Sequence, residues 1–189
     1  MRRPDSARLS LPNLITILRI ILTPLFVILV IQRRFVWAVA VFAAAAVSDG
    51  LDGFLARALG QKTTLGSYLD PIADKLLLAS AYLSLAILHV LPSWLTVIVL
   101  SRDVIILGGA VMLHLIHGPF PIRPLIISKL TTVFQISTLL AVLLAGPLLQ
   151  YGLAAYLPHL FGLTAFLTVV SGLRYISLGI GILTAEERR

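Results

Sequence analysis

Six long apolar runs constrain this chain more than any other feature of its sequence. Each approaches the roughly 20 apolar residues that an α-helix needs to cross a bilayer. Because a backbone in lipid must satisfy its hydrogen bonds internally, such runs predict membrane-spanning helices. We therefore predict an all-α, polytopic integral membrane protein with six transmembrane helices, at residues 11–31, 35–59, 68–90, 93–116, 126–149 and 157–183.

The composition agrees with a membrane protein. Hydrophobic residues make up 59% of the 189 residues and charged residues only 12%, whereas soluble domains average roughly 45–50% and 25%. The chain has no cysteine, which excludes disulfides and thiolate metal sites. Much of the net charge of +7 lies beside or inside the apolar runs, so it indicates contact with anionic lipid and phosphate rather than nucleic acid.

Basic residues in the short connections predict the orientation. An even number of helices puts both termini on one side, where most loop cations fall, whereas Arg33 and Arg34 fall on the other side. Cytoplasmic loops carry the excess of Lys and Arg, so we expect a multi-pass protein of the cell inner membrane with both termini cytoplasmic. Residues 1–189 form a single predicted domain, in which residues 1–10 are a candidate interfacial helix.

Five aspartates lie within or at the ends of the predicted helices. A charge at the bilayer centre costs at least about 2.5–3.5 kcal/mol, so these residues should pair with one another, bind ions or face a shared polar cavity. Counting residues from the membrane surface places four of the aspartates at a similar depth on the cytoplasmic side. We therefore expect a polar cavity open to the cytoplasm, toward which basic residues of the later helices also converge.

These four aspartates form two pairs with helical spacing. Asp49 and Asp52 are three residues apart and Asp70 and Asp74 are four apart, so each pair shares one helix face. A short segment joins the two helices, which predicts antiparallel neighbours whose acidic faces meet. Four carboxylates would repel one another unless cations lay between them, and all-oxygen ligands suit Mg²⁺, Mn²⁺ or Ca²⁺. Two such ions can hold a diphosphate and stabilise the attacking and leaving oxygens of an in-line displacement.

The segment around these aspartates resembles the signature of the CDP-alcohol phosphatidyltransferase family. The pattern Asp49-x2-Asp52-Gly53-x2-Ala56-Arg57-x8-Gly66-x3-Asp70-x3-Asp74 agrees with that signature at every position. The resemblance extends over almost the whole chain, because the family core has six helices. It implies metal-dependent transfer of a phosphatidyl group from CDP-diacylglycerol to an alcohol, with release of CMP, and a homodimer.

The resemblance also implies roles for individual residues. Asp74 would be the general base on the acceptor hydroxyl, and it is the acid deepest along its helix, where a base within reach of the acceptor is needed. The two divalent cations, Mg²⁺ or Mn²⁺, would be bound by Asp49, Asp52 and Asp70, with Asp74 as a further ligand. The nucleotide and diphosphate would be bound by Gly53, Ala56, Arg57 and Gly66.

Two branches of the family share these features and differ in the acceptor. The segments "LPNLITILRIILTP" and "LDPIADKLLL" resemble the anionic-phospholipid branches, whose acceptor is phosphatidylglycerol or glycerol 3-phosphate. In the segment "SRDVIILGGAV", Asp103 stands where the glycerol 3-phosphate branch typically has Glu, and Gly108-Gly109 stands where that branch has an Arg. The combination of "SRDV" with the later segment "IISKLTTVFQ" more closely resembles the phosphatidylglycerol branch. We favour phosphatidylglycerol, as in cardiolipin synthases of the CDP-alcohol type, with glycerol 3-phosphate as the alternative. Arg102 and Lys129 are the predicted acceptor-binding residues.

An ion-coupled transporter is the alternative of another class, because intramembrane acids and bases also mark ion pathways. Transporters tend to show internal repeats and midplane sites formed by broken helices. This chain has no convincing repeat, and its acids cluster toward one face of the membrane. Metal-dependent release of CMP from CDP-diacylglycerol would distinguish the enzyme from a transporter.

Overall fold

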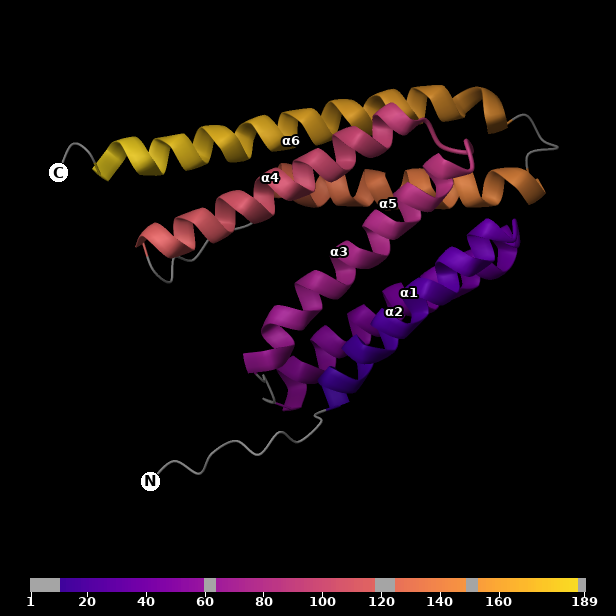
Figure 1. Cartoon of the computed structure of the whole chain (residues 1–189), viewed down its shortest axis with the longest axis horizontal. Coiled ribbons are helices and arrows are strands. Elements are labelled where there is room, and N and C mark those ends of the chain that lie inside the picture. Colours follow the sequence, from indigo (N-terminus) through magenta and orange to yellow (C-terminus); the bar gives the residue numbers. More distant parts are fainter. Residues whose placement is uncertain (1–10, 60–63, 118–124, 149–152, 187–189) are drawn as a thin grey trace. The chain divides into compact units, whose positions relative to one another are not determined.

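The computed structural model is helical throughout the part of the chain that it describes (Figure 1). It describes the backbone of residues 11–59, 64–117, 125–148 and 153–186, and the side chains of residues 17–48, 73, 75–112, 115, 125–145, 155–181 and 184. The elements are α1 (Leu11–Ile31), α2 (Phe35–Leu59), α3 (Thr64–Ile87), α4 (Ser93–His117), α5 (Ile126–Leu148), the short 3-10 helix η2 (Leu153–Tyr156) and α6 (Leu157–Glu186). The prediction of an all-α protein with six helices is confirmed.

The two N-terminal helices begin and end where predicted, and the others differ by a few residues. The largest difference is at α3, which begins at Thr64 instead of residue 68 and ends at Ile87 instead of residue 90. An apolar run marks only the part of a helix that lipid or protein covers, so the polar first turn lies outside the predicted range. Gly66 consequently lies inside this first turn, two residues after the start of α3.

A hydrogen-bonded turn explains where α3 ends. The backbone N–H of Val90 donates to the carbonyl of Leu85 at 3.0 Å, and His89 between them has a left-handed φ of 57°. This arrangement is a Schellman motif, which satisfies the last carbonyls of a helix and reverses the chain. The helix therefore stops before the apolar run does.

Internal contacts divide the chain into two units, Met1–Ser84 and Leu85–Arg189, which we call the N-terminal and C-terminal units and describe separately. In the N-terminal unit α1 packs against α2 (Figure 1). The rings of Phe26 and Phe42 meet across this pair with their centroids 5.8 Å apart. Buried alanines of α2 allow the two backbones to lie close together, as is common between membrane helices.

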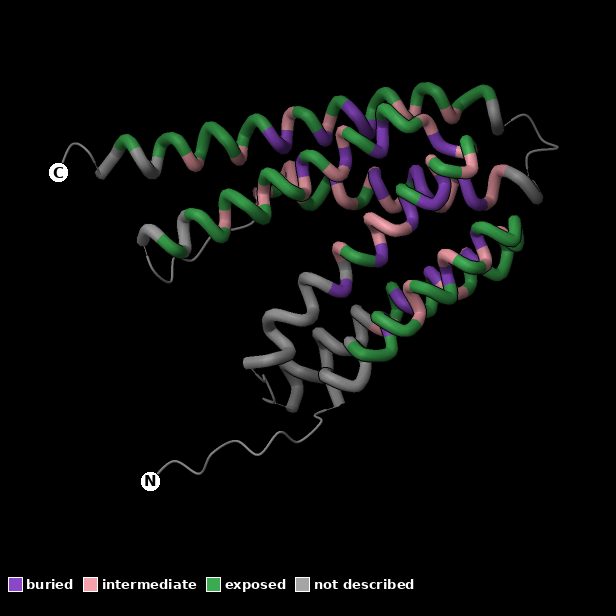
Figure 2. Tube along the Cα trace, in the orientation of Figure 1, coloured by how far each residue is buried: buried purple, intermediate pink, exposed green. Residues whose placement is uncertain are grey.

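In the C-terminal unit α6 packs against both α4 and α5. Figure 2 shows buried positions alternating with exposed ones along these helices. The buried residues of α6 are small or polar, namely Thr164, Ala165, Thr168, Ser171 and Gly172. Side chains of this kind let membrane helices approach closely and form hydrogen bonds with one another.

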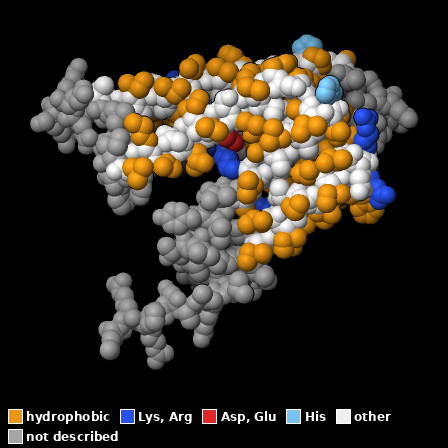
Figure 3. All heavy atoms as spheres, viewed as in Figure 1, with side chains coloured by type: hydrophobic (Ala, Val, Ile, Leu, Met, Phe, Trp, Pro, Cys, Tyr) orange, Lys and Arg blue, Asp and Glu red, His pale blue; other side chains and the backbone are white. Residues whose placement is uncertain are grey.

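The described surface is strongly apolar, and few charged groups interrupt the hydrophobic side chains on the face that Figure 3 shows. Ile21, Val97 and Leu173 are each more than 60% exposed, as expected for side chains that face lipid. Stretches long enough to cross a bilayer lie in α4, α5 and α6, at Ser93–Met112, Ile126–Ala145 and Leu157–Gly181, and the described parts of α1, α2 and α3 contribute shorter apolar stretches. The chain is thus a multi-pass membrane protein, while six spans, the cytoplasmic termini and the cytoplasmic cavity stay predictions.

Candidate active site

The aspartates of the predicted metal site lie on two continuous helices. Asp49 and Asp52 belong to α2, and Asp70 and Asp74 belong to α3. Because the backbone is helical through both pairs, the two members of each pair occupy neighbouring positions on one helix face. The side chains of the whole signature lie outside the described residues: Asp49, Asp52, Gly53, Ala56, Arg57, Gly66, Asp70 and Asp74. The meeting of the two acidic faces therefore stays a prediction.

The residue types at these positions fit divalent cations. Carboxylates are preferred ligands of Mg²⁺ and Mn²⁺, and helical spacing keeps the two members of each pair within about one turn. Among the described side chains, no group of three or more His, Cys, Asp or Glu residues could hold a metal ion. The aspartates of α2 and α3 are the candidate ligands because of their residue type and helical spacing.

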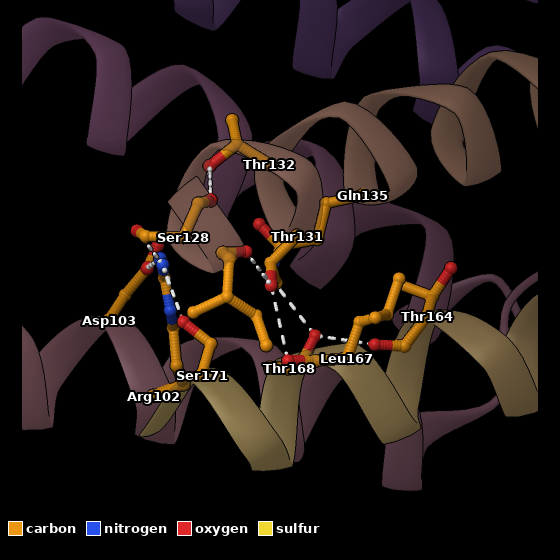
Figure 4. A network of polar contacts seen from close by, with 11 residues as sticks. Arg102, Asp103, Ser128, Thr131, Thr132, Gln135, Thr164, Leu167, Thr168 and Ser171 are labelled. Carbon is orange, nitrogen blue, oxygen red and sulfur yellow. Dashed lines mark hydrogen bonds and ion pairs between the residues drawn. The ribbon is translucent and has the colours of Figure 1, made fainter. Parts of the chain in front are cut away.

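A second group of polar side chains is described in full and lies in the C-terminal unit (Figure 4). Arg102 of α4 is 4% exposed and reaches both α5 and α6. Its Nη2 donates to the hydroxyl of Ser128 on α5 and, at 3.2 Å, to that of Ser171 on α6. Its Nη1 forms an ion pair of 2.7 Å with the carboxylate of Asp103. One guanidinium group thus connects three helices.

Gly172 of α6 leaves room for the stem of Arg102. A Cβ atom at this glycine would lie 3.7 Å from Cγ of Arg102, so alanine would fit there and a larger side chain would displace the arginine. The Nε atom of Arg102 is buried and has no hydrogen-bond partner among the described residues. The guanidinium is therefore held in place on one side and still has an unused donor.

Buried hydroxyl and amide groups continue the connection between α5 and α6. Each bond joins one residue of α5 to one of α6: Thr131 to the carbonyl of Leu167 at 3.1 Å, Gln135 to Thr168 at 3.3 Å, and Thr138 to Thr164 at 2.7 Å. Interhelical hydrogen bonds of this kind contribute about 0.6 kcal/mol each on average in a membrane bundle. Their larger effect here is to fix which residues of the two antiparallel helices lie side by side.

This register places two further cations near Arg102. Lys129 directly follows Ser128 on α5, and Arg174 lies one turn beyond Ser171 on α6. Both side chains are exposed, unlike that of Arg102. The described part of the C-terminal unit contains these three cations and a single acidic residue, Asp103, so this part of the unit carries a net positive charge.

A hollow of about 310 Å³ lies between the start of α5 and the C-terminal half of α6. Leu125 lines it on the α5 side, and Arg174, Ser177, Leu178 and Gly181 line it on α6. The size is at the lower end of the range for small-molecule sites, about 300–1,000 Å³. A guanidinium and a hydroxyl beside leucine side chains suit a phosphate group attached to an apolar chain.

The two predicted acceptor-binding residues differ in their surroundings. Lys129 is exposed and free to reach a ligand, whereas Arg102 is buried and held by three side chains of the bundle. A structural pair of Arg102 with Asp103 was one of two readings that the sequence allowed, whereas the bonds to Ser128 and Ser171 were not predicted, because the prediction rested on charged residues and not on hydroxyl groups. The signal was nevertheless present, since the Ser, Thr and Gln residues recur every three or four positions, at Ser128, Thr131, Gln135 and Thr138 and again at Thr164, Thr168 and Ser171.

Comparison with known proteins agrees with the signature. A sequence model described as CDP-alcohol phosphatidyltransferase matches residues 9–177. The chain belongs to the CDP-alcohol phosphatidyltransferase family. The match includes the signature on α2 and α3 as well as the polar cluster of α4, α5 and α6.

Individual relatives carry two kinds of name. The protein named cardiolipin synthase (CMP-forming) of Rattus norvegicus is 36% identical over 186 residues, which cover 90% of this chain and 61% of the rat protein. A chloroplastic CDP-diacylglycerol–glycerol-3-phosphate 3-phosphatidyltransferase of Oryza sativa is 33% identical over 185 residues, which cover 88% of this chain and 56% of the rice protein. A protein of Pseudomonas fluorescens with the same glycerol-3-phosphate activity in its name is 41% identical over 104 residues, about half of each chain. This chain thus spans about three fifths of the length of the first of these relatives.

We predict that Arg102→Met will destabilise the C-terminal unit. The change removes the ion pair of Arg102 with Asp103 and its hydrogen bonds to Ser128 and Ser171, and each hydrogen bond to a charged group contributes about 1.5–3 kcal/mol. Reversible unfolding in mixed micelles would measure the loss. The double variant Arg102→Met/Asp103→Leu should recover part of the stability, and Ile105→Met, at an exposed position of α4, serves as the control. If the Arg102→Met variant were as stable as the wild type, Arg102 would not be needed to hold α4, α5 and α6 together.

Proposed function

We propose that this protein transfers a phosphatidyl group from CDP-diacylglycerol to an alcohol and releases CMP. The observation that carries this proposal is the agreement of the chain with the family signature at every position from Asp49 to Asp74, on two helical segments. The family match over residues 9–177 supports the same conclusion. So do the names of the rat and rice relatives, which include CMP formation and CDP-diacylglycerol.

In the proposed reaction the acceptor hydroxyl oxygen bonds to the phosphorus that carries the diacylglycerol, and the bond from this phosphorus to the oxygen of CMP breaks. Asp74 takes the proton of the hydroxyl, and CMP leaves with the electron pair of the broken bond. Asp49, Asp52 and Asp70 would hold the divalent cations, Mg²⁺ or Mn²⁺, with Asp74 as a further ligand. When bound, these cations would neutralise the diphosphate and the departing phosphate.

Four other residues of the signature are proposed to bind the nucleotide and the diphosphate. Gly53, Ala56 and Gly66 have small side chains or none, so a ligand can approach the helix backbone closely at these positions. Arg57 offers planar donors that match two phosphate oxygens at once. Together they would hold the CDP group while Asp74 acts on the acceptor.

We assign the phosphate of the acceptor to the cations of the C-terminal unit. Lys129 and Arg174 are exposed and can contact a ligand directly, and Arg174 lines the hollow between α5 and α6. Arg102 would add positive charge from a fixed position, because its hydrogen bonds to Ser128 and Ser171 hold it within the bundle. A cation already in place loses no side-chain freedom when the ligand binds.

Phosphatidylglycerol is the acceptor that we favour, which would make the product cardiolipin. Beyond Arg102, the segment of α4 that contains Gly108 and Gly109 has no lysine or arginine, and a Cβ atom at either glycine would meet nothing within 4 Å. The α4 helix therefore lacks the second arginine expected for the glycerol 3-phosphate branch. A phosphodiester carries less negative charge than the phosphomonoester of glycerol 3-phosphate, and fewer cations would suffice to bind it. Glycerol 3-phosphate is the second candidate, because relatives named for that acceptor also match.

We further propose that the protein works as a homodimer in the cell inner membrane, with both termini on the cytoplasmic side. The excess of basic residues in the connections on the side of the termini supports this orientation. The homodimer is inferred from the family resemblance.

Product analysis tests the proposed function. Purified protein in detergent micelles, supplied with CDP-diacylglycerol and Mg²⁺, should release CMP only when an acceptor alcohol is added. With phosphatidylglycerol the expected lipid product has the mass of cardiolipin, and with glycerol 3-phosphate that of phosphatidylglycerophosphate. Product from the second acceptor alone would reverse our choice of acceptor. No CMP from either mixture would refute phosphatidyl transfer.

We predict that Asp74→Asn will lower turnover by a factor of about 10²–10⁴, the usual contribution of a general base. Mn²⁺ binding, measured by electron paramagnetic resonance, should remain largely intact, because the other three aspartates are unchanged. Binding of a CDP-lipid should likewise persist. If nucleotide binding were lost together with activity, Asp74 would be assigned to substrate binding instead of proton transfer.

We predict that Lys129→Gln and Arg174→Gln will each raise the KM for the acceptor several-fold and leave the KM for CDP-diacylglycerol nearly unchanged. Each change removes one charge-assisted contact at an exposed position, where an ion pair contributes about 0.2–1 kcal/mol, and 1 kcal/mol corresponds to a factor of about five. Steady-state kinetics with each substrate varied in turn would measure both constants. Ser177→Ala, on the same hollow but without a charge, provides a milder control. An equal rise in both KM values would point to a general disturbance of the bundle.

A further inference from the structure

The turn between α1 and α2 carries two adjacent arginines in an unusual backbone conformation. The N–H of Arg34 donates to the carbonyl of Leu29 at 2.9 Å, and the N–H of Arg33 donates to Val30 at the same distance. These bonds form a Schellman motif with Arg33 at its left-handed position, where φ is 57°. Glycine is the residue that this position favours, so a bulky cation there is maintained against the local preference of the backbone.

Neither arginine has an acidic side chain to neutralise it in the part of the N-terminal unit whose side chains are described. That part contains no Asp or Glu, and both arginines are exposed. They also lie on the side of the membrane opposite the predicted cytoplasmic termini, where basic residues are usually scarce. Their charge is therefore available to an anion from outside the protein.

The neighbouring side chains indicate what kind of anion would bind. Ile31, Val36 and Trp37 flank the turn and are 59%, 61% and 65% exposed. Tryptophan prefers the level of the lipid headgroups, with aliphatic side chains deeper in the bilayer. The turn thus presents two guanidinium groups, an indole ring and aliphatic side chains together, which match the phosphate, glycerol and acyl regions of one phospholipid.

We propose that the α1–α2 turn binds the phosphate of an anionic phospholipid in the leaflet opposite the predicted cytoplasmic side. Arg33 and Arg34 contact the phosphate, and Trp37 packs beside the glycerol region. Both arginines are exposed on this turn, where either guanidinium can reach a phosphate at the membrane surface. This lipid site uses none of the residues of the proposed acceptor site, and it does not depend on the proposed reaction.

The intrinsic fluorescence of Trp37 provides the test. The chain has two tryptophans, so Trp94→Phe leaves Trp37 as the single reporter. The protein is reconstituted in phosphatidylcholine vesicles that contain a small, fixed fraction of brominated phosphatidylserine or of brominated phosphatidylcholine. Phosphatidylserine is used because it is neither of the proposed acceptors. The expected result is several-fold stronger quenching by the brominated anionic lipid, with an excess that falls as salt is raised.

Two pairs of substitutions in the Trp94→Phe background separate charge from backbone effects. Arg33→Gly/Arg34→Gln suits the left-handed backbone and should abolish the excess quenching, while thermal unfolding in pure phosphatidylcholine confirms that the protein is folded. Arg33→Lys/Arg34→Lys keeps both charges and should retain most of the excess. Equal quenching by the two brominated lipids before these substitutions, or an excess that survives in the uncharged variant, would overturn the proposal. Loss of the excess when inorganic phosphate replaces chloride at constant ionic strength would also overturn it, in favour of a site for the free ion.

Discussion

A charged side chain within an apolar helical bundle has to be compensated by the protein or by a ligand, and this requirement determines how the C-terminal unit is built. Lipid offers no hydrogen bonds, so the buried guanidinium of Arg102 takes its partners from Asp103, Ser128 and Ser171. Those partners belong to α4, α5 and α6. Satisfying one charge therefore brings three helices together, and the hydroxyl and amide bonds between α5 and α6 extend the same contact along the bundle.

The charged residues of the chain divide according to how they are compensated. Both terminal nitrogens of Arg102 are paired within the bundle, so its side chain has little freedom left to follow a ligand. Lys129 and Arg174 are exposed and are better suited to bind an anion that exchanges with the surroundings. The four aspartates of α2 and α3 are predicted to be the opposite case, since carboxylates that meet repel one another unless cations lie between them. On this basis the N-terminal unit is suited to metal ions and the C-terminal unit to phosphate.

The sequence predicted the helices well because lipid imposes a simple rule of length and polarity, and the family signature was recognisable because its spacing is helical. The errors have physical causes. The start of α3 was placed too late because its first turn is polar, and its end too late because a Schellman motif at His89 stops the helix within the apolar run. The hydrogen bonds from Arg102 to Ser128 and Ser171 were not predicted, because they depend on which serines of α5 and α6 lie side by side. Periodicity within one helix does not determine the register between two.

The division between the two units bears on how an enzyme of this family could distinguish its acceptors. The signature from Asp49 to Asp74 lies wholly within the N-terminal unit, and the CDP-linked lipid that it would serve is common to both proposed acceptors. Residues that differ with the acceptor must then lie elsewhere, and the C-terminal unit supplies the candidates, since Lys129 and Arg174 are exposed there and α4 has glycines where another cation is expected. If the proposed acceptor site is correct, a change of acceptor would involve altered charge on α4, α5 or α6 and no change to the aspartates. The register between α5 and α6 matters for the same reason, because a shift of one turn would move Lys129 by about 5.4 Å relative to Arg174.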